Sequence, residues 1–588
     1  MNSVIGFSIF SNLPDDSTRA LGVAQNRALA YYPHLLKRSL VLGETHLELW
    51  GHTGMDERIH TLPDGSLAVI IGSPHGSVVL KDAQYDLLSN EFEIPWDGRV
   101  ILLRVSPDGK HWTMWNDWLG SIPVFHTQIG QGRVASTLEP VTVAAAGYTP
   151  EDFFIPGLVS LLINGHFMSD WTLYKEMKAI PPDSVMDWDE NGFRARPLGT
   201  VQPSQCRWEK SWDDLVDEMY ELSHRAIADV LKTHPSWILP LSAGLDSRLL
   251  AAVGADLGAD LHLYAWGEPD TTDVVYSHQI ARTLGYPWKH IYLPKDFLVK
   301  YTPQWADLFG SSMHFHGMYQ MAFLDLLKNE PTGPVITGFL GDMLSGASVG
   351  IMDKVHSSQG SCQIFNDWYV DWEVKEIKSL REKNVCPFIA STVENQINAF
   401  TGPRFQKLIF LALWSRLRFF NIFQSTLCDY WRGVADPFMN REYARFAMSL
   451  PRAALDNRRL LADVYRRYYG RLAVIPGTYA KDPFILTGKY LVKRRIVEHL
   501  PVPLHHGPFA GFDDVPLRMD MDCVQAAGKD ALWPLFDAWD QLSEWLDVDL
   551  LEQAYQTIMR SKDDIRPLRK LQSAQTLAYR LLVPQGQN

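Results

Sequence analysis

The chain has 588 residues, of which 46% are hydrophobic and 21% charged, and this composition is typical of a globular protein with more than one core. The net charge of −13 argues against a nucleic-acid partner, because nucleic-acid-binding proteins usually carry a basic surface. Five cysteines, an odd number without a CxxC pair, argue against a disulfide framework or a zinc cluster. The sequence contains no recognisable signal peptide and no apolar run of about 18 residues, so we expect a cytoplasmic protein with no membrane partner.

Residues 1–200 have the pattern of a β-rich domain. Short apolar runs, each bounded by Gly, Pro, Asp or Asn, predict strands at 67–72, 99–105, 111–117 and 184–189. The polar, proline-containing segment 201–210 follows them and marks the predicted domain boundary. We therefore expect a first domain over residues 1–200.

Strands and helices alternate from residue 211 onward. The pattern predicts, in order, a helix at 211–233, a strand at 237–241, a helix at 247–258, a strand at 261–266, a helix at 271–285 and strands at 290–293 and 334–337. Such alternation is typical of a parallel α/β sheet, and beyond about residue 400 the chain is mainly helical. We place a second domain at 211–500 and a helical C-terminal extension at 501–588.

The stretch from Ser242 to Ser247, called loop 242–247 below, joins a predicted buried strand directly to a helix. Its small residues let the backbone approach a ligand, and the N–H groups and dipole of a helix N-terminus favour an anion such as pyrophosphate. Asp246 would repel a phosphate unless a cation lay between them, so the loop implies Mg²⁺. An ordinary strand-to-helix turn with a Ser/Asp cap would look similar, because short Gly/Ser motifs recur by chance.

Four stretches, in the expected order, resemble the asparagine synthetase superfamily, whose synthetase domain is an α/β PP-loop ATP pyrophosphatase fold of the HUP-like class. SAGLDS at 242–247 is similar to that family's S-G-G-x-D-S loop. The other three are YAWGEPD at 264–270, similar to the segment flanking adenine, TGFLGD at 337–342, similar to G-x-G-x-D, and RGVADPFMN at 432–440, similar to R-V-P-F-L-D. The resemblance extends over most of residues 1–490.

This resemblance implies a site for ATP and Mg²⁺ in which a substrate carboxylate is adenylated and an amine then displaces AMP. Asp246 and Asp342 would bind Mg²⁺, and Lys481 matches a late lysine that completes the sites of this family. The residues that would contact ATP, at the pyrophosphate or along the adenine, are Leu241, Ser242, Gly244, Asp246, Ser247, Trp266 and Gly338.

The N-terminal region also resembles this family, in its Ntn glutaminase domain, an α+β fold with a β-sandwich. WNDWLGSIPVF at 115–125 and ASTLE at 135–139 are similar to the segments written R-D-x-L-G-x-x-P-L-Y-Y and F-A-S-E. Glutaminases use a cysteine at position 2 as nucleophile, whereas this chain has Asn2 there, and it has Gly72–His75 in place of an Asn-Gly pair. We therefore expect no glutamine hydrolysis and a domain kept as scaffold, dimer surface or binding platform.

Phe339 lies inside the loop that resembles G-x-G-x-D, where asparagine synthetases have Glu, β-lactam synthetases Tyr and lasso-peptide cyclases often His. Phenylalanine cannot accept the proton that an attacking amine must lose, so a base must come from elsewhere. Glu373 is the first candidate, followed by Glu376, His314 and His316. A solvated helix face would equally explain the glutamates, and core contacts would explain the His pair, which has no evident third metal ligand.

These features favour an ATP-dependent, AMP-forming amide ligase acting on a substrate that has both a carboxylate and an amine. Macrolactam closure, as in a lasso-peptide cyclase, is favoured over small-ring lactam synthesis because the tyrosine of the lactam synthetases is missing. The substrate would then be a processed peptide, and a precursor-processing protease and a second copy of this chain are the partners to consider. Two alternatives stay open: amidation of another carboxylate with free or partner-supplied ammonia, and an inactive nucleotide-binding scaffold.

Overall fold

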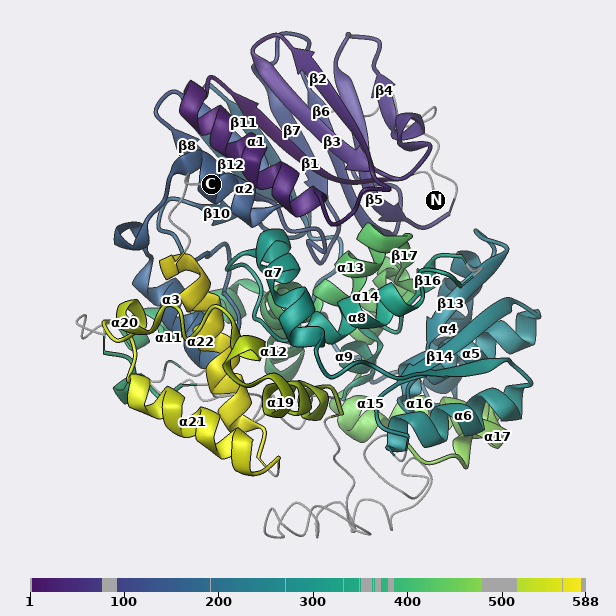
Figure 1. Cartoon of the computed structure of the whole chain (residues 1–588). Helices are drawn as coiled ribbons and strands as arrows, with labels where there is room; N and C mark the ends of the chain where they lie inside the picture. Colours follow the sequence, from purple (N-terminus) through teal and green to yellow (C-terminus); the bar gives the residue numbers. More distant parts are fainter. Residues whose placement is uncertain are drawn as a thin grey trace.

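The computed structural model contains two β-sheets and a large helical part that pack against one another (Figure 1). In Figure 1 the N-terminal sheet lies at the top, the second sheet at the lower right and the C-terminal helices, in yellow, at the lower left. The structure describes residues 3–76, 92–190, 192–269, 271–330, 333–347, 349, 362, 364, 372–378, 385–477, 515–562 and 564–582.

Twelve strands from the first third of the chain form the N-terminal sheet. They are β1 (Val4–Ser11), β2 (Leu36–Leu42), β3 (Thr45–Gly51), β4 (Ile59–Thr61), β5 (Leu67–Pro74), β6 (Gly98–Val105), β7 (Trp112–Asn116), β8 (Phe125–Ile129), β9 (Gly132–Ser136), β10 (Lys178–Ala179), β11 (Ser184–Asp189) and β12 (Gly192–Pro197). The main path runs β10-β8-β9-β1-β5-β6-β7-β11-β12, with β3 and β2 continuing from β1, and β4 pairing with β5. The four strands predicted from the sequence are confirmed as β5, β6, β7 and β11.

Strand β1 shows why this sheet is apolar on both faces. Phe7 and Ile9 pack into a core enclosed by strands, whereas Phe10 belongs to a second core that includes the helices α1 (Asp15–Leu29) and α2 (Glu139–Ala146). Ile5 also belongs to the second core, because a β-bulge between Val4 and Gly6 shifts the alternation there. Successive side chains of a strand point to opposite faces, so both faces are covered here.

The second sheet has five strands that are all parallel, as predicted. They are β13 (Ser236–Pro240), β14 (Asp260–Trp266), β15 (Trp288–Ile291), β16 (Val335–Ile336) and β17 (Val434–Ala435), in the order β15-β14-β13-β16-β17. The helices α4 (Trp212–Leu231), α5 (Leu245–Leu257) and α6 (Thr272–Leu284) precede or connect the first three strands and agree with the predicted segments. The two-residue strand β17 was not predicted.

The strand order of the second sheet creates a switch point. From β13 the chain moves outward through β14 to β15, and it then returns to place β16 on the other side of β13. Ile238 of β13 pairs with Val335 of β16, so both strands end at the same edge. Ligands of open α/β sheets bind outside the carboxyl ends of the strands at such a point, and loop 242–247 follows β13 directly.

The remaining elements of the described chain are helices. The elements before the C-terminal part are η1 (Met55–Arg58), η3 (Pro150–Asp152), α3 (Ile155–Asn164), α7 (Phe297–Phe309), α8 (Met318–Leu326), α9 (Gly341–Ser345), η4 (Val374–Glu376), α11 (Val385–Ala399), α12 (Arg404–Ala412), η5 (Leu413–Asn421), α13 (Phe423–Trp431), η6 (Pro437–Met439), α14 (Arg441–Ala447), α15 (Arg452–Leu455), η7 (Asp456–Arg458), α16 (Arg459–Tyr468) and α17 (Gly470–Ala473). The C-terminal elements are α19 (Val515–Ala527), η10 (Gly528–Leu532), α20 (Trp539–Leu542), α21 (Val548–Arg560) and α22 (Arg566–Leu582).

The C-terminal helices are joined to the rest of the protein by buried contacts. Arg580 of α22 forms a buried ion pair with Glu139 of α2, and the Ser311 hydroxyl donates to the same carboxylate at 2.6 Å. One continuous hydrophobic core contains residues from all three predicted domains, including Ile5, Leu239 and Leu577. The extension predicted at 501–588 therefore includes a helix that packs into the common core.

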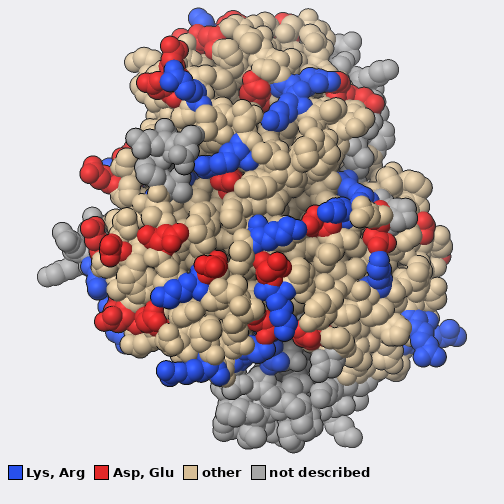
Figure 2. All heavy atoms as spheres, in the orientation of Figure 1, with Lys and Arg blue, Asp and Glu red and all other residues tan. Residues whose placement is uncertain are grey.

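Two findings concern the general expectations from composition. A disulfide joins Cys362 to Cys386, although the odd cysteine count had argued against a disulfide framework; an odd count does not exclude one pair. None of the helices in the described ranges is both long and apolar enough to cross a membrane. On the face seen in Figure 2, basic and acidic side chains are scattered among each other on a surface made mostly of other residues.

Candidate functional site

Loop 242–247 lies at the carboxyl edge of the parallel sheet, between β13 and α5. Its shape is set by hydrogen bonds in which Ser242 N–H donates to Ser247 Oγ (3.2 Å), Gly244 N–H to Ser242 Oγ (3.1 Å) and Ala243 N–H to the Asp273 carboxylate of α6 (2.9 Å). Gly244 is the N-cap of α5. The first turn of a helix presents N–H groups that have no partner within the helix, together with the positive end of its dipole. The loop therefore has the form of an anion site.

A buried guanidinium fixes loop 242–247 from behind. Arg248 is fully buried and donates to four carbonyl oxygens, those of Ala243 (2.8 Å), Leu472 (3.0 Å), Ile475 (2.9 Å) and Pro476 (2.8 Å). Burial lowers the pKa of Arg248 to about 10, so the side chain stays charged at neutral pH. Hydrogen bonds from a charged donor are stronger than neutral ones, and these four tie the loop to the chain around α17.

A second loop, which follows β16, closes tightly against the first. A Cβ atom at Gly338 would lie 3.0 Å from Asp246 Cβ and 3.2 Å from Ser247 N, and a Cβ at Gly341 would lie 2.6 Å from Asp246 Oδ1. Between them Leu340 has a φ of 72°, a left-handed conformation that is unusual for a side chain of this kind. Only glycine fits at positions 338 and 341 without displacing the carboxylate or its backbone.

The four stretches that carry the family resemblance meet at this edge of the sheet. Leu241 N–H donates to Tyr264 O (2.7 Å), which joins the first stretch to the second. The Thr337 hydroxyl donates to Asp436, which joins the third to the fourth. The close approach of Gly338 and Gly341 to Asp246 joins the first stretch to the third. Segments separated by up to about two hundred residues therefore form one surface.

Asp246 and Asp342 are the two carboxylates of this surface. Asp342 is exposed and accepts from Met343 N–H (2.7 Å), while Asp246 is mostly buried and forms an ion pair with Arg458. Burial raises the pKa of Asp246 to about 6, and the nearby charge of Asp342 also raises it, while Arg458 acts in the opposite direction. The arginine therefore only partly offsets the negative charge at this point.

These two carboxylates fit a Mg²⁺ ion that is shared with a phosphate ligand. Within the described ranges no group of three or more His, Cys, Asp or Glu side chains could hold a metal by itself. Mg²⁺ is commonly bound through one or two carboxylates, with substrate phosphates and water completing its shell. The raised pKa of Asp246 means that negative charge here is costly, and a cation would relieve that cost.

The residues predicted along the adenine lie at the ends of the neighbouring strands. Leu241 is buried directly after β13, and Gly338 follows β16. Trp266 ends β14 and is half-buried, with its ring packed on Phe323 (4.5 Å between ring centroids) and near Tyr319 (6.2 Å). The three positions thus lie on three adjacent strands of the sheet, at the carboxyl edge.

Of the predicted catalytic residues, Lys481 lies outside the described residues. Glu373 is the N-cap of η4, and its side chain is 58% exposed and paired with Lys375 (2.7 Å), a contact that lowers the pKa of Glu373. The adjoining residue Ile377 bridges to Leu546 of the C-terminal part. The described contacts of Glu373 therefore lie with η4, and none of them joins it to loop 242–247.

The other proposed bases have structural partners. Glu376 pairs with Lys570 of α22 (2.6 Å). His314 is buried, and the half-buried His316 stacks on Phe420 with 3.8 Å between ring centroids. Burial lowers the pKa of His314 to about 3 and that of His316 as well, so both rings are neutral core side chains, which is the alternative that the sequence had left open.

In the N-terminal region, the segment that stands in place of the glutaminase Asn-Gly pair is packed into a polar contact with the rest of the protein. Ser73 donates to Asp429 Oδ1 (2.6 Å), and Arg99 pairs with the same carboxylate (3.1 Å) and donates to Thr426 (3.1 Å). Burial lowers the pKa of His75 to about 4. Asn2 lies outside the described residues.

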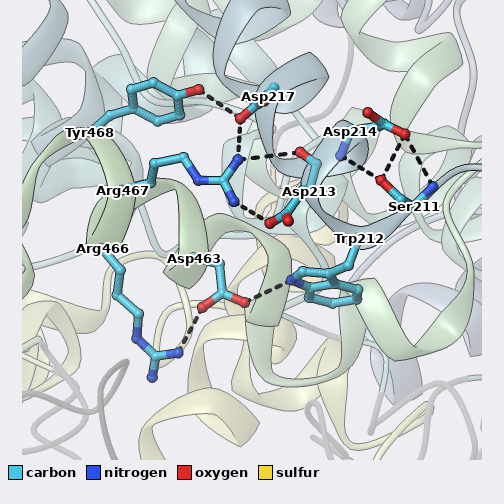
Figure 3. A network of polar contacts seen from close by, with 9 residues as sticks. All are labelled: Ser211, Trp212, Asp213, Asp214, Asp217, Asp463, Arg466, Arg467 and Tyr468. Carbon is cyan, nitrogen blue, oxygen red and sulfur yellow. Dashed lines mark hydrogen bonds and ion pairs between the residues drawn. The ribbon is translucent and has the colours of Figure 1, made fainter.

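Helix α16, which begins after Arg458, is anchored to α4 by the network in Figure 3. Arg467 pairs with Asp213 and Asp217 of α4, and Tyr468 donates to Asp217 (2.7 Å). On the other side, the Trp212 indole donates to Asp463 (2.9 Å). This network holds α16 against α4, and Arg458 reaches Asp246 from the N-terminal end of α16.

Sequence patterns did not identify Arg248, Asp273 or Arg458. Arg248 directly follows the loop, and its position inside an apolar run was the one available signal, since a charged residue there must find partners. Arg458 lies 212 residues from Asp246 in the chain, so only the tertiary fold brings the two together.

Comparison with known proteins adds little to this geometry. No protein-family model and no curated protein matches the chain. Among solved structures, glutamine phosphoribosylpyrophosphate amidotransferase from B. subtilis, complexed with ADP and GMP, matches with 10% identity and a TM-score of 0.22 over 48% of this chain and 65% of that one. A structure described as the allosteric regulatory enzyme of purine biosynthesis matches with 9% identity and a TM-score of 0.22, over 48% of this chain and 64% of that one. The matches thus cover less than two thirds of either chain.

Proposed function

We propose that the protein is an ATP-dependent, AMP-forming amide ligase whose nucleotide lies on loop 242–247. One observation carries the proposal: a strand–loop–helix anion site lies at the switch point of a parallel sheet, with Asp246 and Asp342 converging beside it. A carboxylate in the wall of an anion site would repel the bound anion if no cation lay between them. Two carboxylates beside the loop instead favour a ligand that arrives with a divalent cation, as a nucleoside triphosphate does.

In the proposed reaction a substrate carboxylate oxygen attacks the α-phosphorus of ATP, and the bond to the leaving pyrophosphate breaks. An amine nitrogen then attacks the acyl carbon of the mixed anhydride, AMP leaves, and the amine loses one proton. Ser242, Ser247 and the first turn of α5 would hold the pyrophosphate, which stabilises the charge that develops on it. Mg²⁺, held by Asp246 and Asp342, would supply further neutralisation of this charge.

We further propose that the amine and the carboxylate belong to one substrate and that the product is a ring, as in a lasso-peptide cyclase. Asn2 cannot act as the nucleophile that releases ammonia from glutamine, so the amine must have another source. Ser73 and Arg99, which line the corresponding part of the N-terminal region, are bonded to Asp429. Lys481 is the proposed catalytic lysine. Phe339 has no basic group, so a different residue must accept the proton of the amine.

Nucleotide binding tests the first part of the proposal. We expect the full chain to bind a non-hydrolysable ATP analogue in the presence of Mg²⁺ in isothermal titration calorimetry. Asp246→Asn and Asp342→Asn should each weaken this binding by about tenfold or more, since each removes a charge-assisted contact to the metal. Asp229→Asn, at an exposed carboxylate on α4 that pairs with Lys232, is the matched control and should bind as the wild type does. Equal affinity in all four proteins would contradict the proposal.

Product analysis tests the second part. With linear peptides that carry a free N-terminal amine and a side-chain carboxylate, we expect AMP and pyrophosphate in equal amounts and a peptide that has lost one water. ADP and phosphate as products would contradict adenylation. Formation of an amide only after ammonium is added would favour the ammonia-dependent alternative.

A further inference from the structure

Among the described residues, Arg458 is a cation that pairs with a carboxylate of the candidate site, and its surroundings are unusual. It pairs with Asp246, and its Nε donates to Ser345 Oγ (2.8 Å) of α9, the helix that begins at Gly341. Asp342 is also close enough for its carboxylate to stabilise the charge of the Arg458 guanidinium. The guanidinium therefore bridges loop 242–247 and the loop after β16 at the point where the structure places both proposed metal ligands.

The backbone that presents Arg458 is held in a strained conformation. Asn457 and Arg458 have φ values of 52° and 56°, so two consecutive residues that are not glycine adopt left-handed geometry. Such conformations persist only where the surrounding structure enforces them, and they concentrate at functional sites. Arg458 is the N-cap of α16, and from this turn its guanidinium pairs with Asp246.

Helix α16 itself is firmly placed, which leaves the side chain as the part that can move. The network of Figure 3 fixes the helix to α4, and Tyr465 of α16 donates to the Leu245 carbonyl (2.6 Å) in the first turn of α5. An arginine has five N–H donors and a long side chain. From a fixed helix start, it can exchange one acceptor for another on the same surface without a change of fold.

We propose that Arg458 is a phosphate-binding residue that is held on Asp246 while the nucleotide site is empty. When a triphosphate or pyrophosphate arrives with its divalent cation, Arg458 releases Asp246 to the cation and pairs with a phosphate oxygen. A guanidinium and a divalent cation compete for the same carboxylate oxygens, and guanidinium binds phosphate as well as carboxylate through paired N–H groups. The cation alone would then bind weakly, and the phosphate ligand would be needed to seat it.

This inference rests on the proposed nucleotide site, and it predicts that one substitution changes two binding affinities in opposite directions. Arg458→Gln frees Asp246, so Mn²⁺ added alone should bind about tenfold more tightly than to the wild type, as followed by the paramagnetic resonance signal of free Mn²⁺. The same variant should bind pyrophosphate in the presence of Mg²⁺ about tenfold more weakly, because one charge-assisted contact is lost. A residue that merely supports the fold would weaken both.

The neighbouring arginine is the matched control. Arg459 lies with its guanidinium carbon 4.8 Å from the centroid of the Trp212 ring of α4, and Arg459→Gln should leave both affinities unchanged. Should Arg458→Gln fail to fold, Ser345→Ala provides a second route: it removes the acceptor of Nε, together with the hydrogen bond that the Ser345 hydroxyl donates to the Gly341 carbonyl (2.6 Å), and it should raise the Mn²⁺ affinity about twofold to threefold.

The possible outcomes separate this inference from the proposed function. Unchanged or weaker Mn²⁺ binding in both Arg458→Gln and Ser345→Ala overturns the exchange, and so does the absence of Mn²⁺ binding in every protein. If the wild type binds neither ATP nor pyrophosphate, the proposed function fails, while a tighter Mn²⁺ site in Arg458→Gln still establishes that Arg458 competes for Asp246.

Discussion

The Arg99–Asp429 pair and the Arg458–Asp246 pair join the same two types of side chain in different surroundings. The side chains of Arg99 and Asp429 are 3% and 5% exposed, and Ser73 donates a further hydrogen bond to the carboxylate. Those of Arg458 and Asp246 are 12% and 16% exposed, and a second carboxylate, Asp342, lies beside them. The first pair is enclosed between the N-terminal sheet and α13, whereas the second lies at an open sheet edge.

The comparison teaches that burial of an ion pair does not define its role. A carboxylate that accepts bonds from a serine and an arginine inside a closed contact is satisfied, and it holds two parts of the chain together. A carboxylate whose pKa stays raised although an arginine contacts it is still costly to ionise. A divalent cation in place of the arginine would stabilise its negative charge further. Each prediction below tests one side of this contrast.

The largest effect is expected at the enclosed pair. Asp429→Ala leaves Arg99 buried without its counter-charge, and breaking a buried pair in this way costs about 3–5 kcal/mol. We expect a clearly lower melting temperature in calorimetry, with Mg²⁺-ATP binding unchanged in the protein that stays folded. Replacing both partners by apolar residues, as in Arg99→Met with Asp429→Leu, should recover much of the loss. If Asp429→Ala is as stable as the wild type, the enclosed Arg99–Asp429 pair does not stabilise the fold in the way described.

The next effect is a pH dependence at the open pair. The pKa of Asp246 is about 6 in the folded protein and 3.8 as the reference, so folding favours the protonated form. Its contribution to stability is full below pH 4 and is lost as the pH rises through 6, by up to about 3 kcal/mol. The wild type should therefore lose stability relative to Asp246→Asn between pH 4 and pH 7 in urea unfolding. A constant difference between the two proteins would show that Asp246 ionises without this cost.

The close approach of the two loops gives a third test. A methyl group at Gly341 would displace the Asp246 carboxylate, and overpacking of this kind costs about 1–3 kcal/mol. We expect Gly341→Ala to bind Mg²⁺-ATP at least about tenfold more weakly, as measured by calorimetry. Gly22→Ala is the control, because Gly22 lies within α1 with no atom within 4 Å of its added methyl, and it should bind normally.

The smallest effect is expected in the surface network of Figure 3. Arg467 is 37% exposed, and exposed ion pairs contribute only about 0–1 kcal/mol. Arg467→Ala should therefore change stability by less than about 1 kcal/mol and weaken Mg²⁺-ATP binding about twofold, through a looser attachment of α16 to α4. A loss as large as that of Gly341→Ala would mean that the position of α16, and not only its side chains, controls the site.

The sequence predicted those elements of the fold whose hydrophobic period and boundary residues lie within one continuous stretch of chain. The strands β5, β6, β7 and β11 and the alternating elements from α4 to β15 have the period of their secondary structure and clear boundary residues. Strand β17 has two residues and no period, and it is a strand only because β16 pairs with it. In the N-terminal region, β1 was missed because a strand buried on both faces lacks alternation.

For the candidate site, the sequence by itself determined loop 242–247, because the strand, the loop and the helix that make it are contiguous. It also named Asp342 and the glycines beside it, through a motif that is local in the chain. Only the tertiary structure decided which groups face these residues: the return of the chain to β16 brings Asp342 to Asp246, and α16 brings Arg458 to the same carboxylate. A contact between residues 212 positions apart leaves no local pattern, since it depends on how the intervening elements pack.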